Sequence, residues 1–374
     1  MNVARIALVT GANQGLGRAL AEGLAARMDP ADLVLLTGRN AERVAAAAAE
    51  VAEAPDTRSQ VRGRVLNVAD TGSIVALAAE LRESHGGVDI VLSNAITRLT
   101  PDRPQSEQAD EFIDVSNIAT HTILRAFGPI LRPGGRLIVV ASTLGALGHL
   151  PERLRPLFDG ATLDQVEYAV ESWRSAIHSE TTTEAGWPRW LNVPSKVAQV
   201  AAVRAVAAER RDRDSVTGTL VAAVCPGMVD TATSRPWFSD FRHAQTPAAA
   251  ARAVLDLVLT RVSIRGCMAN WSASARLCHG IPARRRSSRI GCSLHELGCG
   301  ACLLPMRCGG FRLAEGGGEF GEVVGDRFEG DQTAARSGEF GCGGQQLVVA
   351  APHHRFVAEG SGGSGGEAGA EFEQ

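Results

Sequence analysis

The segment Thr10-Gly11-Ala12-Asn13-Gln14-Gly15-Leu16-Gly17 stands between an apolar run, residues 6–9, and an amphipathic stretch, residues 18–27. The apolar run predicts a buried strand, and the spacing of apolar residues in the second stretch predicts a helix. Glycines between a strand and a helix permit a tight turn and let the backbone approach a pyrophosphate, which the free N–H groups of the helix N-terminus attract. The segment therefore predicts a dinucleotide-binding turn.

The same alternation of strands and helices continues along the chain. Further strands are expected at residues 33–36, 61–66, 88–92, 136–140 and 219–224, and an alanine-rich helix at residues 41–52. Continuous Val/Ile/Leu runs separated by helices are typical of a parallel sheet that is covered on both faces. The sequence thus predicts an α/β fold, a doubly wound Rossmann-like sheet that binds its ligand beyond the carboxyl ends of its strands.

The composition changes near residue 262. Seven of the eight cysteines lie after it, and 23 of the 41 glycines lie in the last 112 residues. Basic residues concentrate in 263–312 and acidic residues in 313–374. Glycine-rich sequence with little periodicity and segregated charge is typical of disorder. We predict one dinucleotide-binding domain, residues 1–262, followed by a low-complexity, mostly disordered extension, residues 263–374.

Three interpretations of the extension compete. Cys299 and Cys302 form a Cys-x-x-Cys pair that matches a zinc site, but a second close pair is missing. The arginine-rich run 284–289 is a candidate for phosphate binding. The favoured interpretation is an unstructured segment that arises from a shifted reading frame or a wrong gene end, and no metal site is predicted.

The overall composition excludes several classes of protein. A hydrophobic fraction of 45% excludes a wholly disordered chain, and a net charge of −3 gives no general attraction to nucleic acid. The sequence has no apolar run of about 18 residues, the length of a transmembrane helix, and no secretory h-region follows Met1. We therefore expect a cytoplasmic protein without nucleic-acid or membrane partners.

Arg39 indicates which dinucleotide is bound. It follows the second expected strand, where NAD-binding folds usually place an acidic residue that holds the ribose hydroxyls. A guanidinium instead pairs with phosphate, so NADP(H) is favoured over NAD(H). A solvated surface arginine is the alternative, and Gln14 supplies no second positive charge.

Several motifs occur in the order typical of the short-chain dehydrogenase/reductase family, and the chain resembles its classical branch over about residues 1–262. Residues 10–17 are similar to the TGxxxGxG cofactor loop, and Ser93-Asn94-Ala95-Ile96 to the NNAG motif. Asn67-Val68 resembles the pair that contacts adenine, and residues 225–231 resemble the loop that holds the nicotinamide carboxamide. With Arg39, the resemblance implies a cofactor site made of Gly11, Asn13, Gln14, Gly15, Leu16, Gly17, Asn67, Val68, Asn94, Ala95, Lys196, Pro226, Gly227, Val229 and Thr231.

The resemblance also implies the catalytic residues. Ser142, just after the expected strand 136–140, matches the catalytic serine, and Asn117 matches the asparagine that completes the proton relay. Lys196 matches the lysine of the Tyr-x-x-x-Lys signature, but Asn192 stands where the family has its tyrosine.

A helical insertion is expected at residues 150–185. Apolar residues recur there at helical spacing: Leu163, Val166, Val170, Trp173 and Ile177. The following Gly186-Trp187-Pro188 resembles the carbonyl-reductase-like branch of the family, in which such a segment separates the serine from the tyrosine. In the family this segment covers the usual dimer helices, so a monomer is favoured over a homo-oligomer.

Asn192 leaves two hypotheses for the function. In the family, the tyrosine hydroxyl donates a proton to the carbonyl oxygen as hydride reaches the carbon, whereas a carboxamide is no acid near neutral pH. The leading hypothesis is an NADP-preferring oxidoreductase that transfers hydride between nicotinamide and a carbonyl or secondary alcohol, with a water relayed by Ser142 and Lys196. The alternative is a non-catalytic dinucleotide-binding protein. Tyr168, the only tyrosine, is expected on the surface, opposite the apolar stripe of its helix.

Lys196 is the only lysine among 38 basic residues; all the others are arginines. An ammonium differs from a guanidinium in size and in the ease with which its pKa shifts. The single use of lysine therefore indicates a specific role, which the resemblance identifies as binding the nicotinamide ribose.

Overall fold

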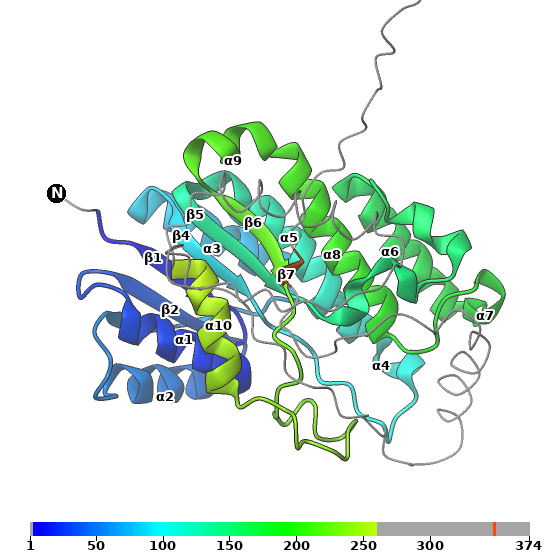
Figure 1. Ribbon diagram of the computed structural model, residues 1–374, viewed down its shortest axis with the longest axis horizontal. Coiled ribbons are helices and arrows are strands. Elements are labelled where there is room, and N and C mark those ends of the chain that lie inside the picture. Colours follow the sequence, from blue (N-terminus) through cyan, green and yellow to red (C-terminus); the bar gives the residue numbers. More distant parts are fainter. Residues whose placement is uncertain (1–2, 260–346, 349–374) are drawn as a thin grey trace, which may run out of the picture.

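A computed structural model of the protein describes residues 3–259 and 347–348. A sheet with the strand order β3-β2-β1-β4-β5-β6-β7 forms the centre of the molecule, and helices cover both of its faces (Figure 1). All neighbouring strands pair in parallel except β6 and β7. The predicted doubly wound, Rossmann-like sheet is therefore confirmed.

The elements follow the predicted alternation. The strands are β1 (Ile6–Val9), β2 (Leu33–Gly38), β3 (Gln60–Val65), β4 (Val88–Ser93), β5 (Leu131–Val140), β6 (Leu220–Val224) and β7 (Leu347–Val348). The α-helices are α1 (Gly15–Arg27), α2 (Ala41–Ala52), α3 (Thr71–His85), α4 (Gln105–Ile113), α5 (Ala119–Phe127), α6 (Leu163–His178), α7 (Thr182–Ala185), α8 (Asn192–Glu209), α9 (Arg211–Thr217) and α10 (Pro247–Leu259). A π-helical turn, η1 (Asp114–Ile118), joins α4 to α5, and the 3₁₀ turns are η2 (Gly128–Ile130), η3 (Thr143–Gly145), η4 (Leu147–His149) and η5 (Glu152–Leu157).

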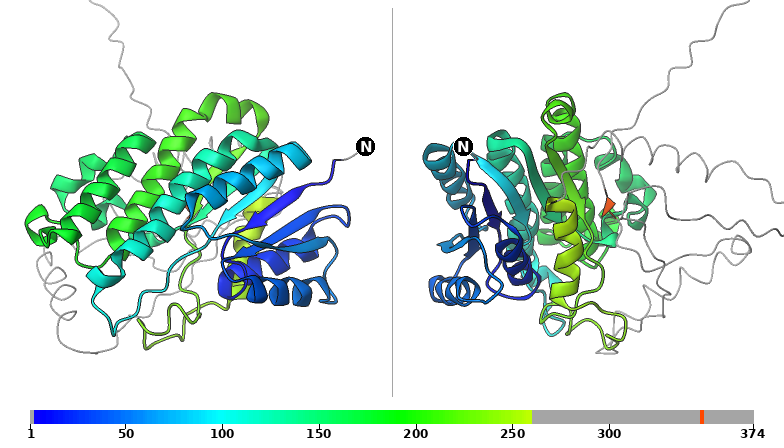
Figure 2. Two further views of the ribbon diagram at one scale, coloured as in Figure 1. Left: turned by 180° about the vertical axis from the view of Figure 1, so that it is seen from behind. Right: turned by 60° about the vertical axis from the view of Figure 1, so that its left-hand side comes forward.

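Two apolar layers hold the sheet. On one face, side chains of α1, α2 and α10 pack against the strands, and α10 crosses in front of the sheet in Figure 1. On the other face lie α3, α5 and α8, with α4 and α6 packed outside them; this layer is in front in the left view of Figure 2. β1 and β2 are buried along their whole length because both layers cover them.

The strand predicted at residues 61–66 forms as β3, one residue earlier in the chain, and unlike β1 and β2 it is mostly exposed. Five of its six residues are exposed, because β3 lies at the edge of the sheet and pairs only with β2 among the strands described. Arg62 and Arg64 alternate along it, which is typical of an edge strand that must not pair with another chain.

The helix expected in the insertion forms as α6. The predicted apolar stripe is buried, and Trp173 at its centre is 1% exposed. The helix begins with a capping box: the Thr162 hydroxyl accepts from the Gln165 N–H, and the Gln165 side chain accepts from the Thr162 N–H. Tyr168 is 77% exposed, so its predicted surface position is confirmed.

Of the predicted extension, the structure describes only Leu347–Val348, which form β7, antiparallel to β6. The predicted disorder, the cysteine pair and the arginine-rich run lie outside the described residues. Within the described residues, no helix has both the length and the apolar character needed to span a membrane.

Candidate functional site

The glycine-rich turn after β1 has the backbone that a phosphate site needs. Gly11 and Gly15 have φ angles of 63° and 57°, a left-handed conformation that side chains other than glycine rarely adopt. Helix α1 begins at Gly15, and the preceding Gln14 forms no side-chain cap. The first N–H groups of α1 are therefore not occupied by a capping side chain, and they are available to an anion.

The end of β4 supports this turn. A Cβ atom on Gly17 would lie 2.3 Å from the Gly11 carbonyl oxygen and 2.5 Å from Nδ2 of Asn94. That Nδ2 donates to the carbonyl oxygens of Thr10 (3.1 Å) and Gly11 (3.3 Å). Ala95 packs so close that a Cβ on Gly11 would lie 2.8 Å from its Cα. The structure thus brings Asn94 and Ala95 together with the three glycines.

We expect Gly17→Ala to lower NADPH affinity roughly tenfold or more and the free energy of unfolding by about 1–3 kcal/mol. The added methyl group overlaps the Gly11 carbonyl, so the turn and the start of α1 must move apart. Fluorescence titration with NADPH and urea unfolding measure the two effects. Gly148→Ala is the matched control, because among the described residues nothing beyond its chain neighbours lies within 4 Å of its added methyl; equal losses in both variants would contradict the interpretation.

Arg39 follows β2 at the rim of the site. Its Nη1 donates to Oε1 of Glu111 on α4 at 2.9 Å, and both side chains are exposed. Asn13 of the glycine turn lies beside the end of the same strand, where a Cβ on Gly38 would be 3.1 Å from its Oδ1. Arg43 is in the first turn of α2, four residues after Arg39, and makes no ion pair within the described residues. Two arginines therefore lie within five residues of the end of β2.

Asn67 and Val68 follow β3. The Asn67 side chain accepts from the N–H of Ala69 at 3.3 Å, and its carbonyl accepts from the N–H of Asp70 at 3.1 Å, so Asn67 forms a local turn. Val68 is 7% exposed and belongs to the apolar layer around α3. No side-chain hydrogen bond joins either residue to the glycine turn within the described residues.

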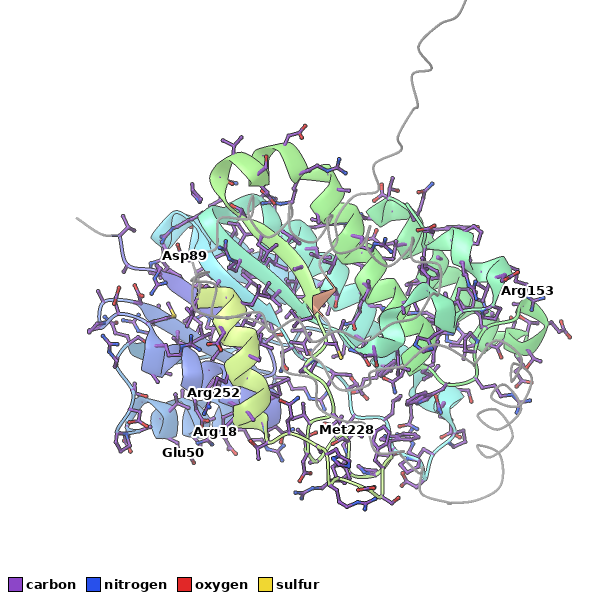
Figure 3. The ribbon with its side chains drawn as sticks, viewed as in Figure 1. Arg18, Glu50, Asp89, Arg153, Met228 and Arg252 are labelled. Carbon is purple, nitrogen blue, oxygen red and sulfur yellow. The ribbon has the colours of Figure 1, made fainter. Side chains whose placement is uncertain are left out.

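The loop after β6 contains the predicted nicotinamide-side residues; Figure 3 labels Met228 within it. Gln245 holds this loop: its side chain donates to the Pro226 carbonyl (3.1 Å), and its N–H donates to the Met228 carbonyl (2.8 Å). Val229 is buried beside it and forms a β-bridge with it. Gly227 has a φ of 77°.

The loop after β6 also reaches the glycine turn. A Cβ on Gly15 would lie 3.7 Å from Cγ2 of Thr231. The two loops that the resemblance assigns to one cofactor therefore lie next to each other.

Ser142, Asn192 and Lys196 lie where β5 meets α8. Ser142 caps η3, where its Oγ accepts from the Leu144 N–H at 3.3 Å, and η3 packs on α8. Asn192 is the first residue of α8, and Lys196 follows one helical turn later, on the same face of the helix. The Asn192 side chain makes no hydrogen bond within the part of the chain that the structure describes.

The Lys196 ammonium is buried, with the residue 7% exposed. Its Nζ donates to Oε1 of Gln199 at 2.8 Å and to the Val140 carbonyl at 3.4 Å. Burial lowers the pKa of Lys196 from 10.5 to about 8, and the negative charge of an ionised Cys225 opposes this change. Sequence reasoning predicted Lys196 but missed Gln199, whose signal is a lone amide in the Ala/Val-rich buried face of α8.

Asn117 lies in the π-turn η1, and it is fully buried. Its Nδ2 donates to the Ser195 carbonyl at 3.0 Å, and its Oδ1 has no partner within the described residues. A π-turn inside a helix is often found at functional sites. The structure thus places Asn117 directly behind the backbone of Lys196.

Two tryptophans form an aromatic contact in front of α8. The rings of Trp190 and Trp237 have centroids 6.4 Å apart. Trp237 Nε1 donates to the Leu99 carbonyl at 3.1 Å, whereas Trp190 Nε1 is buried without a partner in the described part of the chain. Trp190 precedes Asn192 by two residues, so this pair provides an apolar wall near position 192.

Comparison with known proteins identifies the family of this chain. The family described as short chain dehydrogenase matches residues 5–151. Carbonyl reductase (NADPH) 3 of Mus musculus is 30% identical over 241 residues, which cover 62% of this chain and 84% of the relative. Carbonyl reductase (NADPH) 1 of Oryctolagus cuniculus is 31% identical over 240 residues, covering 61% and 82%. The chain belongs to the short-chain dehydrogenase family.

Solved structures of this fold agree. Salutaridine reductase from Papaver somniferum superposes with a TM-score of 0.58 at 19% identity, covering 68% of this chain and 96% of that chain. Menthone neomenthol reductase from Mentha piperita gives a TM-score of 0.56 at 22% identity, covering 69% and 95%. These two structures show the same fold, and the sequence relatives are carbonyl reductases of an oxidoreductase family.

Sequence reasoning also missed Arg43 and Glu111. Arg43 had a usable signal, its spacing of four residues from Arg39 at the start of a helix. Glu111 had none, because 72 residues separate it from Arg39. In the described residues, no group of three or more His, Cys, Asp or Glu side chains is placed to hold a metal ion.

Proposed function

We propose that this protein is an NADP-preferring oxidoreductase that transfers hydride between the nicotinamide and a carbonyl or secondary alcohol. The observation that carries the proposal is the glycine turn after β1 together with the buried Lys196 ammonium beside the end of β5. Because β1 and β5 belong to one parallel sheet, their carboxyl ends lie at the same edge. The similarity to carbonyl reductases that are named for NADPH supports the same chemistry.

The residues present fit a dinucleotide. Gly11 and Gly17 let the turn pack tightly against Ala95, Asn94 and its own backbone, and Gly15 leaves the start of α1 open to a pyrophosphate. Lys196 would hold the nicotinamide ribose, and the loop 226–231 would hold the nicotinamide. When bound, NADPH supplies the hydride. Ser142 would orient the substrate oxygen, and Asn117 would hold a relay water.

The second candidate is a dinucleotide-binding protein without turnover. Asn192 favours it, because a carboxamide at the position of the acid has no proton to donate near neutral pH. The two candidates share the binding site and differ only in proton transfer.

The NADP preference rests on the two guanidinium groups at the end of β2. Arg39 would pair with the 2′-phosphate, and Arg43 adds a second positive charge in the first turn of α2. Glu111 competes with the phosphate, because it already accepts from Arg39. An exposed ion pair contributes only about 0.2–1 kcal/mol, so a phosphate can displace it.

We expect Arg39→Ser to lower NADPH affinity about 10- to 100-fold and to leave NADH affinity almost unchanged, since only NADPH presents a phosphate to this side chain. Glu111→Gln should act in the opposite direction and raise NADPH affinity by about two- to fivefold, because it frees Arg39. Calorimetric titration with both nucleotides measures these changes. Equal losses of NADPH and NADH affinity in Arg39→Ser would show that Arg39 does not bind the 2′-phosphate.

Two measurements on the full chain test the proposal. Binding of NADPH and NADH is measured first, and NADPH oxidation is then followed with a panel of aldehydes, ketones and quinones. Tight NADPH binding with turnover supports the oxidoreductase, and tight binding without turnover supports the second candidate. A folded protein with no saturable affinity for either nucleotide would overturn both.

A further inference from the structure

Gln199 is a polar residue in the buried face of α8. It is 4% exposed, and its neighbours Val200, Ala202 and Val203 are buried apolar residues. Burying an amide is costly unless its hydrogen-bonding groups find partners. The burial of Gln199 is therefore tolerated only if its amide groups find hydrogen-bond partners.

Both ends of the Gln199 amide are paired. Its Nε2 donates to the Ser116 carbonyl at 2.6 Å and to Oγ1 of Thr120 at 3.1 Å. The Thr120 hydroxyl donates its own hydrogen to the same Ser116 carbonyl at 2.7 Å, so its oxygen is left to accept from Gln199. These contacts fix which way the amide points. Its Oε1 must face the Lys196 ammonium, 2.8 Å away.

Two amides link the π-turn η1 to α8 on either side of Lys196. Asn117 Nδ2 donates to the carbonyl of Ser195, the residue just before the lysine. Gln199, three residues after it, donates to the carbonyl of Ser116 and accepts from Nζ. Asn117 thus holds the backbone before Lys196, and Gln199 holds its charged end.

An ammonium has three hydrogens. One reaches Gln199 and one is directed at the Val140 carbonyl, 3.4 Å away. The third has no partner within the described residues. We propose that Gln199 is a positioning residue: it orients the Lys196 ammonium from behind, so that the free hydrogen faces the nicotinamide ribose. Only the ribose contact rests on the proposed function; Gln199 acts through Lys196 and does not touch the cofactor.

The Gln199 carbonyl also supports the charge of Lys196. Burial lowers the pKa of the ammonium to about 8, and an oxygen dipole at 2.8 Å opposes that effect. The charged or titratable groups of the elements around α8 are Cys225 after β6, Asp114 in η1, His121 and Arg125 on α5, Arg132 and Arg136 on β5, and Asp164, Glu167, Tyr168, Glu171, Arg174 and His178 on α6. Of these, Cys225 is the one whose charge acts on Lys196.

Because Lys196 is the only lysine, its titration can be followed directly. Full-length protein labelled with ¹³C at the lysine Cε gives one lysine NMR signal, whose shift is recorded between about pH 6 and pH 10 without nucleotide. We expect the parent midpoint near pH 8. Gln199→Met, which removes the acceptor, should lower the midpoint by about one pH unit, and Gln199→Glu should raise it by about one pH unit.

Midpoint shifts of opposite sign in Gln199→Met and Gln199→Glu distinguish a positioning role from a purely structural one, because a structural role would leave the midpoint of a folded variant unchanged. Gln108→Met is the matched control: Gln108 is also buried, but its amide donates to the carbonyls of Thr100 and Arg103, and we expect the parent midpoint. If Gln199→Glu does not fold, the midpoint of Gln199→Met alone tests the proposal, and an unchanged midpoint in the folded variant would overturn it.

The same titrations in a Cys225→Ala background show that the NMR shift does not report ionisation of the thiol.

NADPH affinity at pH 8 gives the second measurement. Gln199→Met should bind NADPH about tenfold more weakly than the parent, and Gln199→Glu should regain most of the loss. If the parent binds no NADPH, the proposed function fails while the lysine titration still tests Gln199. If the parent binds NADPH and the midpoint moves but the affinity does not, the orientation toward the ribose is wrong.

Discussion

Asn192→Tyr should raise the rate of NADPH-dependent carbonyl reduction by about 10²- to 10⁴-fold, the range that a positioned general acid contributes. Position 192 is the first residue of α8, and the Lys196 ammonium follows one helical turn later. A tyrosine hydroxyl there can donate a proton to the developing alkoxide, and the nearby positive charge lowers its pKa below the usual 10. The side chain of Asn192 makes no hydrogen bond within the described residues, so its replacement breaks no hydrogen bond there.

The measurement is NADPH oxidation with the carbonyl panel, at equal nucleotide saturation of each variant. Asn192→Phe supplies the ring without the hydroxyl and should gain nothing, which separates proton donation from packing against Trp190. Tyr168→Phe should leave every rate unchanged, because Tyr168 is 77% exposed on α6. Equal activity in the parent and in Asn192→Tyr would show that position 192 is not the position of the acid.

Lys196→Met should have two effects of opposite sign. NADPH affinity should fall about 10- to 100-fold, because a charge-assisted hydrogen bond to the ribose is lost. The free energy of unfolding of the nucleotide-free protein at pH 7 should rise by about 1–2 kcal/mol. Lowering the pKa from 10.5 to about 8 means that the folded state bears a cost of about 3 kcal/mol for the buried charge, and the lost hydrogen bond to Gln199 offsets part of the gain.

The pH dependence of stability tests whether the buried charge of Lys196 is what lowers the free energy of unfolding. Between pH 8 and pH 10.5 the unfolded chain keeps a proton on Lys196 that the folded chain has lost. The contribution of this group to stability therefore rises with pH across that window and is most unfavourable below it. The parent should gain about 3 kcal/mol across this window, which is more than its deficit at pH 7, so in urea unfolding its stability should overtake that of Lys196→Met before pH 10.5.

Arg136→Met is the matched control for a buried cation. The Arg136 guanidinium donates to the carbonyls of Gly134, Gly135 and Gly218, on strand β5 but away from Ser142. Its replacement should lower stability, because three carbonyls lose their donor, and should leave NADPH affinity unchanged. A Lys196→Met protein that binds NADPH as the parent does would contradict the assignment of the ribose contact.

Local patterns were sufficient for most of the fold. Some features depend only on residues close in sequence, so they can be predicted without knowing which elements pack together. They are the glycines at 11, 15 and 17, the apolar run of β1 and the helical stripe of α6. β3 shows the limit. Its place between two helical segments predicts a strand, but whether a strand is central or at an edge depends on the order in which distant segments pair.

The site shows the same division. The single lysine, the asparagine at 192 and the arginine after β2 are visible in the sequence because residue type and motif order identify them. Their partners are not visible in the sequence. Glu111 is 72 residues from Arg39, and the Ser116 carbonyl that orients the Gln199 amide is 83 residues from it. A hydrogen bond depends on distance and direction between atoms, and these are set when the π-turn η1 packs against α8, an event that no local pattern encodes.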